Sequence, residues 1–174
     1  PMITGDYHGE RLGACTDCRR MWARHRAGEL DETEIAGVEE SLATTSGTCT
    51  VRGTASTMAC MAEALGMMLP GGATPPSPTG TRLRHATRTG RRAVELAREP
   101  LLARDILTRS AFLNALQVLA AVGGSTNAIV HLIAIARRAG VMLDLDLFDA
   151  LARKTPLLAN IRPSGKYLME DFYY

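Results

Sequence analysis

The chain has 174 residues, of which 46% are hydrophobic and 22% are charged, a composition typical of a globular protein with a sizeable core. Its formal net charge of +2 is too small to indicate a nucleic-acid partner. No apolar run reaches the roughly 18 residues of a membrane-spanning helix and no signal peptide is visible, so we expect a cytoplasmic protein without a membrane partner. Four cysteines are too few for a secreted disulfide framework, which favours reduced thiols or metal ligands.

Helical periodicity dominates the first half of the chain. We expect a helix over 17–26 and a second one that begins after Asp31, where Glu34 completes a capping box. A third helix is expected over 54–68, because its apolar residues recur at spacings of three and four. Residues 70–80 are rich in proline and glycine, which predicts an irregular loop.

Further helices are expected in the second half over four segments: 82–98, 111–122, from Ser125 or Thr126 to Arg138, and from Asp144 or Asp146 to Lys154. The arginines of the first of these helices are expected to form a solvated face. The apolar run Leu157–Ile161 predicts a buried strand, and residues 1–5 resemble the end of another strand. Strands at both margins need partners, so the sequence predicts a mostly helical internal fragment of an α/β protein.

The segment 46–66, with the sequence SGTCTVRGTASTMACMAEALG, is the most informative part of the chain. It places Cys49 in a turn rich in glycine and threonine, ahead of an amphipathic helix. Free backbone N–H groups and the positive end of the helix dipole favour a thiolate there, and such a thiolate can hold an anionic metal centre. The alternative is a buried, inert cysteine before a helix.

Three further segments of the chain are also distinctive: Gly123–Ala128 followed by His131 and Leu132, Ile135–Val141, and Leu158–Asp171. With residues 46–71 they occur in the order found in the dihydroxy-acid, 6-phosphogluconate and sugar-acid dehydratases, so the chain resembles this family over nearly its whole length. The segment Arg162–Tyr174 is most similar to the sugar-acid branch, whose members act on aldonates such as arabinonate or xylonate.

The resemblance implies a two-domain enzyme, in which residues 1–174 form part of a three-layer α/β/α N-terminal domain and the C-terminal domain lies outside the chain. It also implies a homodimer or homotetramer that dehydrates a small sugar acid or dihydroxy acid to a 2-keto acid. In this family three distant cysteines hold a [2Fe–2S] cluster, and Cys49 matches the third. The cluster iron then acts as a Lewis acid on the departing hydroxyl, and Mg²⁺ binds beside the substrate.

No motif for the magnesium ligands or for the family's proton-abstracting serine occurs in these residues, so the catalytic residues are unknown. Near the cluster or the substrate we expect a small set of polar residues: Thr48, Ser125, Thr126, Asn127 and Lys166. For the residues at 125–127 helix capping is the alternative, and for Lys166 it is a solvated turn.

The remaining cysteines and His131 favour structural roles. Cys15 and Cys18 form a CxxC pair, but no second pair follows to complete a zinc site, and the resemblance assigns no cluster ligand to this segment. Cys60 is expected to be a small buried residue within a helix, and His131 a hydrogen-bonded core histidine. Besides the hydro-lyase, two other functions stay open: a non-catalytic helical scaffold or contact module, and a zinc-binding domain that uses Cys15 and Cys18.

Overall fold

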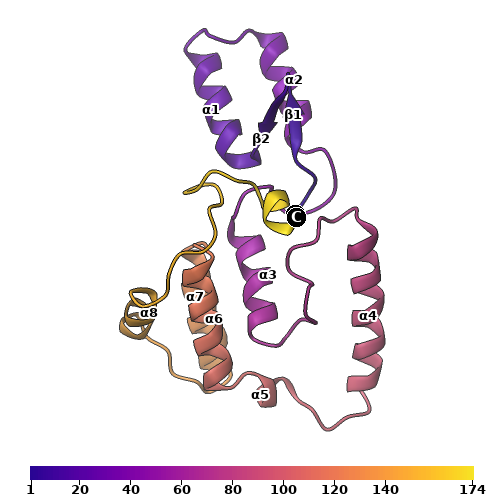
Figure 1. Cartoon of the computed structure of the whole chain (residues 1–174), viewed down its shortest axis with the longest axis vertical. Helices are drawn as coiled ribbons and strands as arrows, with labels where there is room; N and C mark the ends of the chain where they lie inside the picture. The colour runs from indigo at the N-terminus through magenta and orange to yellow at the C-terminus, as the bar shows by residue number, and fades with distance from the viewer.

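The computed structural model describes residues 1–174 as a mainly helical chain with one small sheet (Figure 1). In chain order its elements are β1 (Gly5–Tyr7), β2 (Glu10–Leu12), α1 (Ala14–Arg26), α2 (Glu32–Leu42), α3 (Thr54–Ala64), α4 (Gly80–Leu96), α5 (Ala103–Ile106), α6 (Arg109–Ala121), α7 (Asn127–Arg138), α8 (Leu145–Ala152) and α9 (Met169–Tyr173). The short helices α5 and α9 were not expected from the sequence. No helix combines the length and the apolarity needed to cross a lipid bilayer.

A hairpin and two helices form one end of the molecule, at the top of Figure 1. β1 and β2 pair antiparallel with Gly5 opposite Leu12. His8 and Gly9 connect them with φ values of 51° and 83°, the left-handed conformation that a tight two-residue hairpin turn requires. α1 and α2 pack on this hairpin around a small buried cluster: Leu12, Met21, Ile35 and Val38.

The ends of the helices mostly follow the expected local signals, but α1 begins at Ala14, three residues before the expected position 17. α2 begins at the predicted capping box, in which Asp31 and Glu34 each accept the other's backbone N–H at 2.8 Å. α3 ends at Ala64 and not near residue 68, because Gly66 takes a φ of 81° and turns the chain out of the helix. α8 begins after Asp144, whose carboxylate accepts the N–H of Leu147 at 2.7 Å.

The larger core lies among α3, α6, α7 and α8, in the lower half of Figure 1. α6 is the largely buried helix that the sequence predicted, and α3 packs against both α6 and α7. The buried cluster has twelve members: Cys60, Met61, Leu65, Ala73, Phe112, Ala115, Leu116, Leu119, Ala128, Leu132, Ala136 and Leu143. One cluster therefore stabilises residues 12–38 and the other residues 60–143, and Cys49 lies in the segment between them.

The segment 70–80 is irregular, as predicted, and connects α3 to α4. The guanidinium of Arg82 donates to the carbonyl oxygens of Gly72 at 2.6 Å and Pro75 at 2.7 Å, which ties α4 to this loop. In Figure 1 α4 stands beside the rest of the molecule. Its other arginines mostly face solvent, as expected: Arg84, Arg88 and Arg91.

The predicted strand over Leu157–Ile161 is wrong. The first two leucines of the segment are 65% and 77% exposed, and only Ile161 makes an isolated bridge, to Tyr167. The segment turns back on itself, since the N–H of Tyr167 donates to the carbonyl of Asn160 at 2.9 Å. An apolar run between two prolines is therefore a loop here, because its backbone groups bond to its own return segment and to the end of α6.

The sheet is smaller than the fold prediction requires. Residues 1–4 are irregular, and β1 begins at Gly5 with its partner β2 inside the chain. The prediction of a mostly helical chain is confirmed, and the small sheet is compatible with an α/β fragment. Residues 1–174 do not form a three-layer α/β/α arrangement, so that part of the prediction is not confirmed.

The last helix, α9, attaches the end of the chain to its beginning. Glu170 Oε2 accepts the N–H of Thr4 at 3.1 Å, and Asp171 Oδ1 lies 2.7 Å from Arg11 Nη1. Asp171 Oδ2 also accepts the N–H of Leu168 at 2.8 Å. Burial acts to raise the pKa of Asp171, but the N–H of Leu168 and the Arg11 guanidinium together hold it below its usual value.

We predict that Asp171→Asn destabilises the protein by about 0.5–1 kcal/mol at neutral pH, a modest loss because water screens the partly exposed ion pair. A lowered carboxyl pKa contributes stability above the unfolded pKa of about 3.9 and loses it as pH falls through the folded value. The difference in urea-unfolding free energy between wild type and variant should therefore disappear in acid. Glu40→Gln, at an exposed position without an ion pair, is the control. An undiminished difference at low pH would contradict the assignment.

Candidate functional site

Cys49 lies in the irregular segment between α2 and α3, and hydrogen bonds hold this segment from both sides. On the N-terminal side the buried Thr50 hydroxyl donates to the carbonyl of Leu12 at 3.4 Å. On the C-terminal side the N–H of Met169 donates to the carbonyl of Thr50 at 2.7 Å, and the N–H of Arg52 donates to that of Arg162 at 2.8 Å. Three parts of the chain that are distant in sequence therefore meet around Cys49.

The sulfur of Cys49 lies 3.8 Å from the sulfur of Cys15. Cys15 is exposed and belongs to the first turn of α1, whereas Cys49 is partly buried. All four cysteines are free thiols. Sequence reasoning missed this pair, because it considered Cys15 only with Cys18 and nothing local relates positions 15 and 49. The contact exists because Thr50 places the Cys49 segment against the end of β2, immediately before α1.

Burial raises the pKa of the Cys49 thiol above its ordinary value, and the adjacent Cys15 raises it further, while a backbone hydrogen bond lowers it by less. The sequence had suggested the opposite, a thiolate favoured by the following helix. α3 begins only at Thr54, so Cys49 is not in its first turn and the helix dipole acts weakly there. A metal that binds Cys49 must therefore displace a proton from a mainly neutral thiol.

The start of α1 is fixed by Asp17, whose side chain is almost completely buried. Its Oδ2 accepts the N–H of Gly13 and bonds to Arg162, and its Oδ1 accepts from Arg20 Nε at 3.1 Å. These partners compensate the buried carboxylate. They also attach the helix that carries Cys15 to the 160–168 segment, which itself bonds to the Cys49 segment through Arg52. The sequence had not singled out Asp17.

The predicted polar group at 125–127 meets the start of α3. Asn127 Nδ2 donates to Thr54 Oγ1 at 2.9 Å, and the hydroxyls of Thr54 and Ser125 lie 3.4 Å apart. The N–H of Ser125 donates to Thr57 Oγ1 at 3.0 Å. This close approach needs Gly124, where an added Cβ would lie 2.7 Å from Thr57 Cγ2. The N-termini of α3 and α7 therefore converge. Ser125 and Asn127 both contact Thr54, which is five positions after Cys49 in the chain.

The other residues predicted near the cluster or the substrate make fewer side-chain contacts. Thr126 is exposed and makes no side-chain capping bond, while Ser125 Oγ accepts the N–H of Asn127 at 3.3 Å. Thr48 is exposed beside Cys49. Lys166 is exposed, and its Nζ lies 5.5 Å from the ring centre of Tyr167. Its segment reaches Cys49 only indirectly, through the backbone bonds of Arg162 to Arg52 and of Met169 to Thr50.

Two expectations for single side chains have different outcomes. His131 is exposed on α7, so the core histidine that the sequence suggested is wrong. Cys60 is buried, as expected, with 8% of its surface exposed. Its sulfur lies 3.8 Å from Nη1 of the buried Arg52, whose guanidinium stacks 4.7 Å from the ring centre of Phe172. Arg52 Nε and Nη2 have no hydrogen-bond partner.

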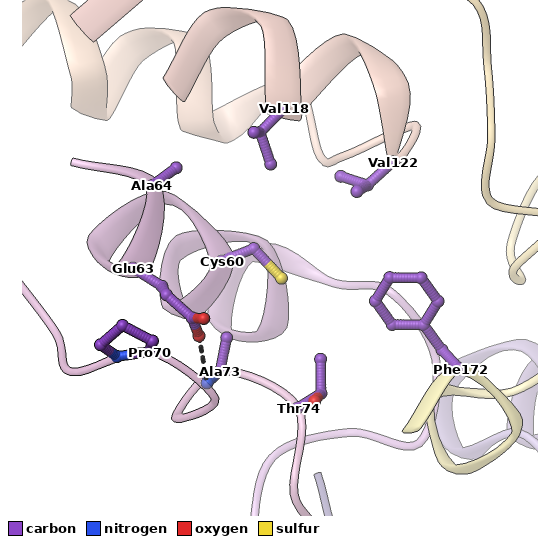
Figure 2. A pocket seen from close by; sticks show the side chains of 9 residues that line it. All are labelled: Cys60, Glu63, Ala64, Pro70, Ala73, Thr74, Val118, Val122 and Phe172. Carbon is purple, nitrogen blue, oxygen red and sulfur yellow. Dashed lines mark hydrogen bonds between the residues drawn. The ribbon is translucent and has the colours of Figure 1, made fainter. Parts of the chain in front are cut away.

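Cys60 borders a cavity of about 410 Å³ beside α3 and α6. Figure 2 shows its sulfur directed into the space that Phe172 closes on one side and that Val118 of α6 and Val122, just after this helix, cover on another. Glu63, on the other side, accepts the N–H of Ala73 at 2.9 Å. The cavity wall is mainly apolar, and Cys49 is not part of it. This cavity is therefore distinct from the predicted metal ligand.

No group of three or more histidine, cysteine, aspartate or glutamate side chains is arranged to hold a metal ion within residues 1–174. The structure thus brings one additional sulfur to Cys49, but not a third ligand. Cys18 lies in the first half of α1 and is partly buried, and no residue joins it and Cys15 into a zinc site.

The whole chain, residues 1–174, matches the family described as dihydroxy-acid/6-phosphogluconate dehydratase N-terminal. It is 44% identical over 173 residues to the dihydroxy-acid dehydratase of Thermodesulfovibrio yellowstonii, covering 99% of this chain and 32% of that protein. It is 47% identical over 174 residues to the L-arabinonate dehydratase of Rhizobium leguminosarum bv. trifolii, covering 100% and 30%. A dihydroxy-acid dehydratase of Sulfolobus acidocaldarius is 43% identical over 167 residues, covering 96% and 30%. The chain therefore spans 30–32% of the length of these relatives.

Proposed function

Because this chain belongs to the dihydroxy-acid/6-phosphogluconate dehydratase family, we propose that it is part of a hydro-lyase that dehydrates a sugar acid or a dihydroxy acid to a 2-keto acid. The observation that carries the proposal is the match of all 174 residues to a dehydratase family. Relatives named dihydroxy-acid dehydratase and L-arabinonate dehydratase support the two substrate classes. In this proposal residues 1–174 are part of the N-terminal domain, and a C-terminal domain completes the enzyme.

Cys49 is the proposed ligand of a [2Fe–2S] cluster. Its thiol is partly exposed in a segment that is held from both sides, so it can reach a metal without a rearrangement of the backbone. Since no third ligand is present, we assign the remaining cluster ligands to residues outside 1–174.

When bound, such a cluster supplies an iron with an open position that can act as a Lewis acid on a hydroxyl group. The chain's own residues hold and orient the reactants. Cys49 would lose its proton and hold the cluster, beside the exposed Thr48. Ser125, Thr126 and Asn127 offer hydroxyl and amide groups at the start of α7, where an anion is stabilised by the helix dipole.

Lys166 supplies a mobile positive charge for the substrate carboxylate. No group of three or more potential ligands is arranged to hold Mg²⁺ within residues 1–174, and we assign no step to this ion here. We place the protein in the cytoplasm, where its four free thiols stay reduced, and propose a homodimer or homotetramer.

A second candidate is a non-catalytic helical scaffold or contact module. Two observations favour it: residues 1–174 contain no complete metal site, and several large apolar side chains on the helices of the main core are exposed, among them Val130 and Leu145. In this case the chain would bind another protein surface and would have no chemistry of its own.

An assay of the protein that carries this chain distinguishes the two candidates. The protein is first reconstituted anaerobically with iron and sulfide. It is then incubated with Mg²⁺ and arabinonate, xylonate or dihydroxyisovalerate, and the formation of a 2-keto acid is measured. We expect turnover of at least one substrate. The 174-residue chain alone is the matched control, and it should hold no stable cluster and show no turnover.

Two outcomes would contradict the proposal. If the whole protein with a full iron content turned over none of these acids, the scaffold would be the better explanation. If the 174-residue chain alone held a stoichiometric cluster and turned over an acid, the assignment of the missing ligands to other residues would be wrong.

A further inference from the structure

Cys15 and Cys49 form a pair of thiols that the fold, and not the local sequence, creates. Their sulfur atoms are 3.8 Å apart, although 34 positions separate them in the chain. No third histidine, cysteine or carboxylate joins them, so within residues 1–174 the pair is not a metal site. Two adjacent thiols with one of them exposed have the arrangement needed for oxidation to a disulfide.

We propose that Cys15 and Cys49 are a modification site, at which the metal-free protein reacts with a low-molecular-weight disulfide such as oxidised glutathione and forms an internal disulfide bond. The sulfurs must approach by about 1.8 Å to reach the disulfide bond length of about 2.05 Å. A hydrogen bond beside the thiols holds their two segments together, since the Thr50 hydroxyl donates to the carbonyl of Leu12.

Exposure assigns the two roles in this reaction. Cys15 faces solvent in the first turn of α1, so an external disulfide can reach its sulfur. Cys49 is partly buried and is better placed to attack a sulfur that is already attached next to it. Cys60 is excluded from the pair, because it is buried in the main core and its sulfur contacts Arg52.

The reaction consists of two exchange steps. In the first, the Cys15 thiolate attacks one sulfur of oxidised glutathione, the glutathione S–S bond breaks, and one glutathione leaves as a thiolate that takes up a proton. In the second, the Cys49 thiolate attacks the Cys15 sulfur of the mixed disulfide and expels the second glutathione, which is also protonated. Two protein thiols are oxidised to one disulfide, and one glutathione disulfide is reduced to two thiols.

The pair itself depends only on the fold, but its consequence for metal binding rests on the proposed function. A sulfur bonded to Cys15 cannot bind iron, so the oxidised protein would have to be reduced before Cys49 could accept a cluster. Conversely, a bound cluster would occupy Cys49 and leave Cys15 without a resolving thiol.

The experiment treats the metal-free protein that carries this chain with oxidised glutathione and identifies linked peptides by mass spectrometry. Trypsin together with a protease that cuts before aspartate places the four cysteines on four peptides: 12–16, 17–19, 31–52 and 53–82. We expect peptides 12–16 and 31–52 to be linked, with the loss of two free thiols per chain and their recovery after dithiothreitol.

Cys18→Ser is the matched control, because it changes the same residue type on the same helix and should leave the link unchanged. Cys15→Ser should abolish the link and leave Cys49 as a free thiol or a single glutathione adduct. The proposal is overturned if Cys15 is linked to Cys18, if Cys15 and Cys49 carry separate glutathione groups in the wild type, or if no thiol is lost.

The same treatment of the iron-loaded protein separates this proposal from the proposed function. If Cys49 binds the cluster, the link should be lost while the cluster absorbance persists, and this loss would support both proposals. If the link forms equally fast with iron bound, the thiol pair stands and the assignment of Cys49 as a cluster ligand fails.

Discussion

Cys49→Ser should abolish the brown iron–sulfur absorbance and the dehydratase activity together in the protein that carries this chain. A serine hydroxyl is a poor ligand for cluster iron, and the proposed cluster would have only three cysteine ligands, so the loss of one would leave too few. The measurements are the visible absorbance spectrum, the iron content per chain after anaerobic reconstitution, and 2-keto-acid formation. We expect the iron content and the activity to fall to background.

Cys60→Ala and Cys18→Ser are the controls for this experiment. Cys60 borders the apolar cavity beside α3, so its truncation should retain the cluster and cost at most about 1 kcal/mol of stability. Loss of the cluster in Cys60→Ala would show that the wrong cysteine has been assigned. Normal iron content in Cys49→Ser would refute the ligand role directly, even if activity were lost.

Phe112→Ala should be among the most destabilising single substitutions in this part of the protein, at about 3–5 kcal/mol. Phe112 is 0% exposed on α6, and it belongs to the cluster that joins α3, α6 and α7. Removing its ring leaves a cavity that close-packed neighbours fill only in part. Equilibrium urea unfolding, followed by circular dichroism, measures the loss as a lower midpoint.

Val130→Ala on α7 is the matched control for this substitution. Val130 is 68% exposed, and alanine has the higher helix propensity, so this variant should be as stable as the wild type or slightly more stable. A large loss in Val130→Ala would show that this face of α7 is covered by another part of the protein. A loss below about 1 kcal/mol in Phe112→Ala would contradict the assignment of the main core.

Local sequence signals predicted most of the helices in this chain. The capping box of Asp31 and Glu34, the buried face of α6 and the proline-rich loop at 70–80 are all found where they were expected. These features depend on residues at most a few positions apart, so the local pattern contains the necessary information. The family membership was likewise predictable, because four segments occur in a characteristic order, and the match over all 174 residues confirms it.

The apolar run at 157–161 shows where local patterns fail. Its composition is that of a buried strand, but a strand needs a neighbour with free backbone groups, and here Asn160 bonds to the returning Tyr167 instead. The prediction of a core histidine at position 131 was wrong for a related reason. The apolar sequence of α7 did not reveal that the face of the helix with His131 is exposed. Burial is a property of the whole packing and not of the segment.

The sequence thus determined the helices, the family and the candidate ligand Cys49, because each depends on residue types at short spacing. Only the tertiary structure decided which groups surround that ligand. It placed Cys15 at 3.8 Å from Cys49, buried Asp17 between Gly13 and Arg162, and directed Asn127 to Thr54 at the start of α3. Apart from the local bond between Gly13 and Asp17, these contacts join positions 34 to 145 residues apart, and they form because two hydrophobic clusters fix the connecting segments against one another.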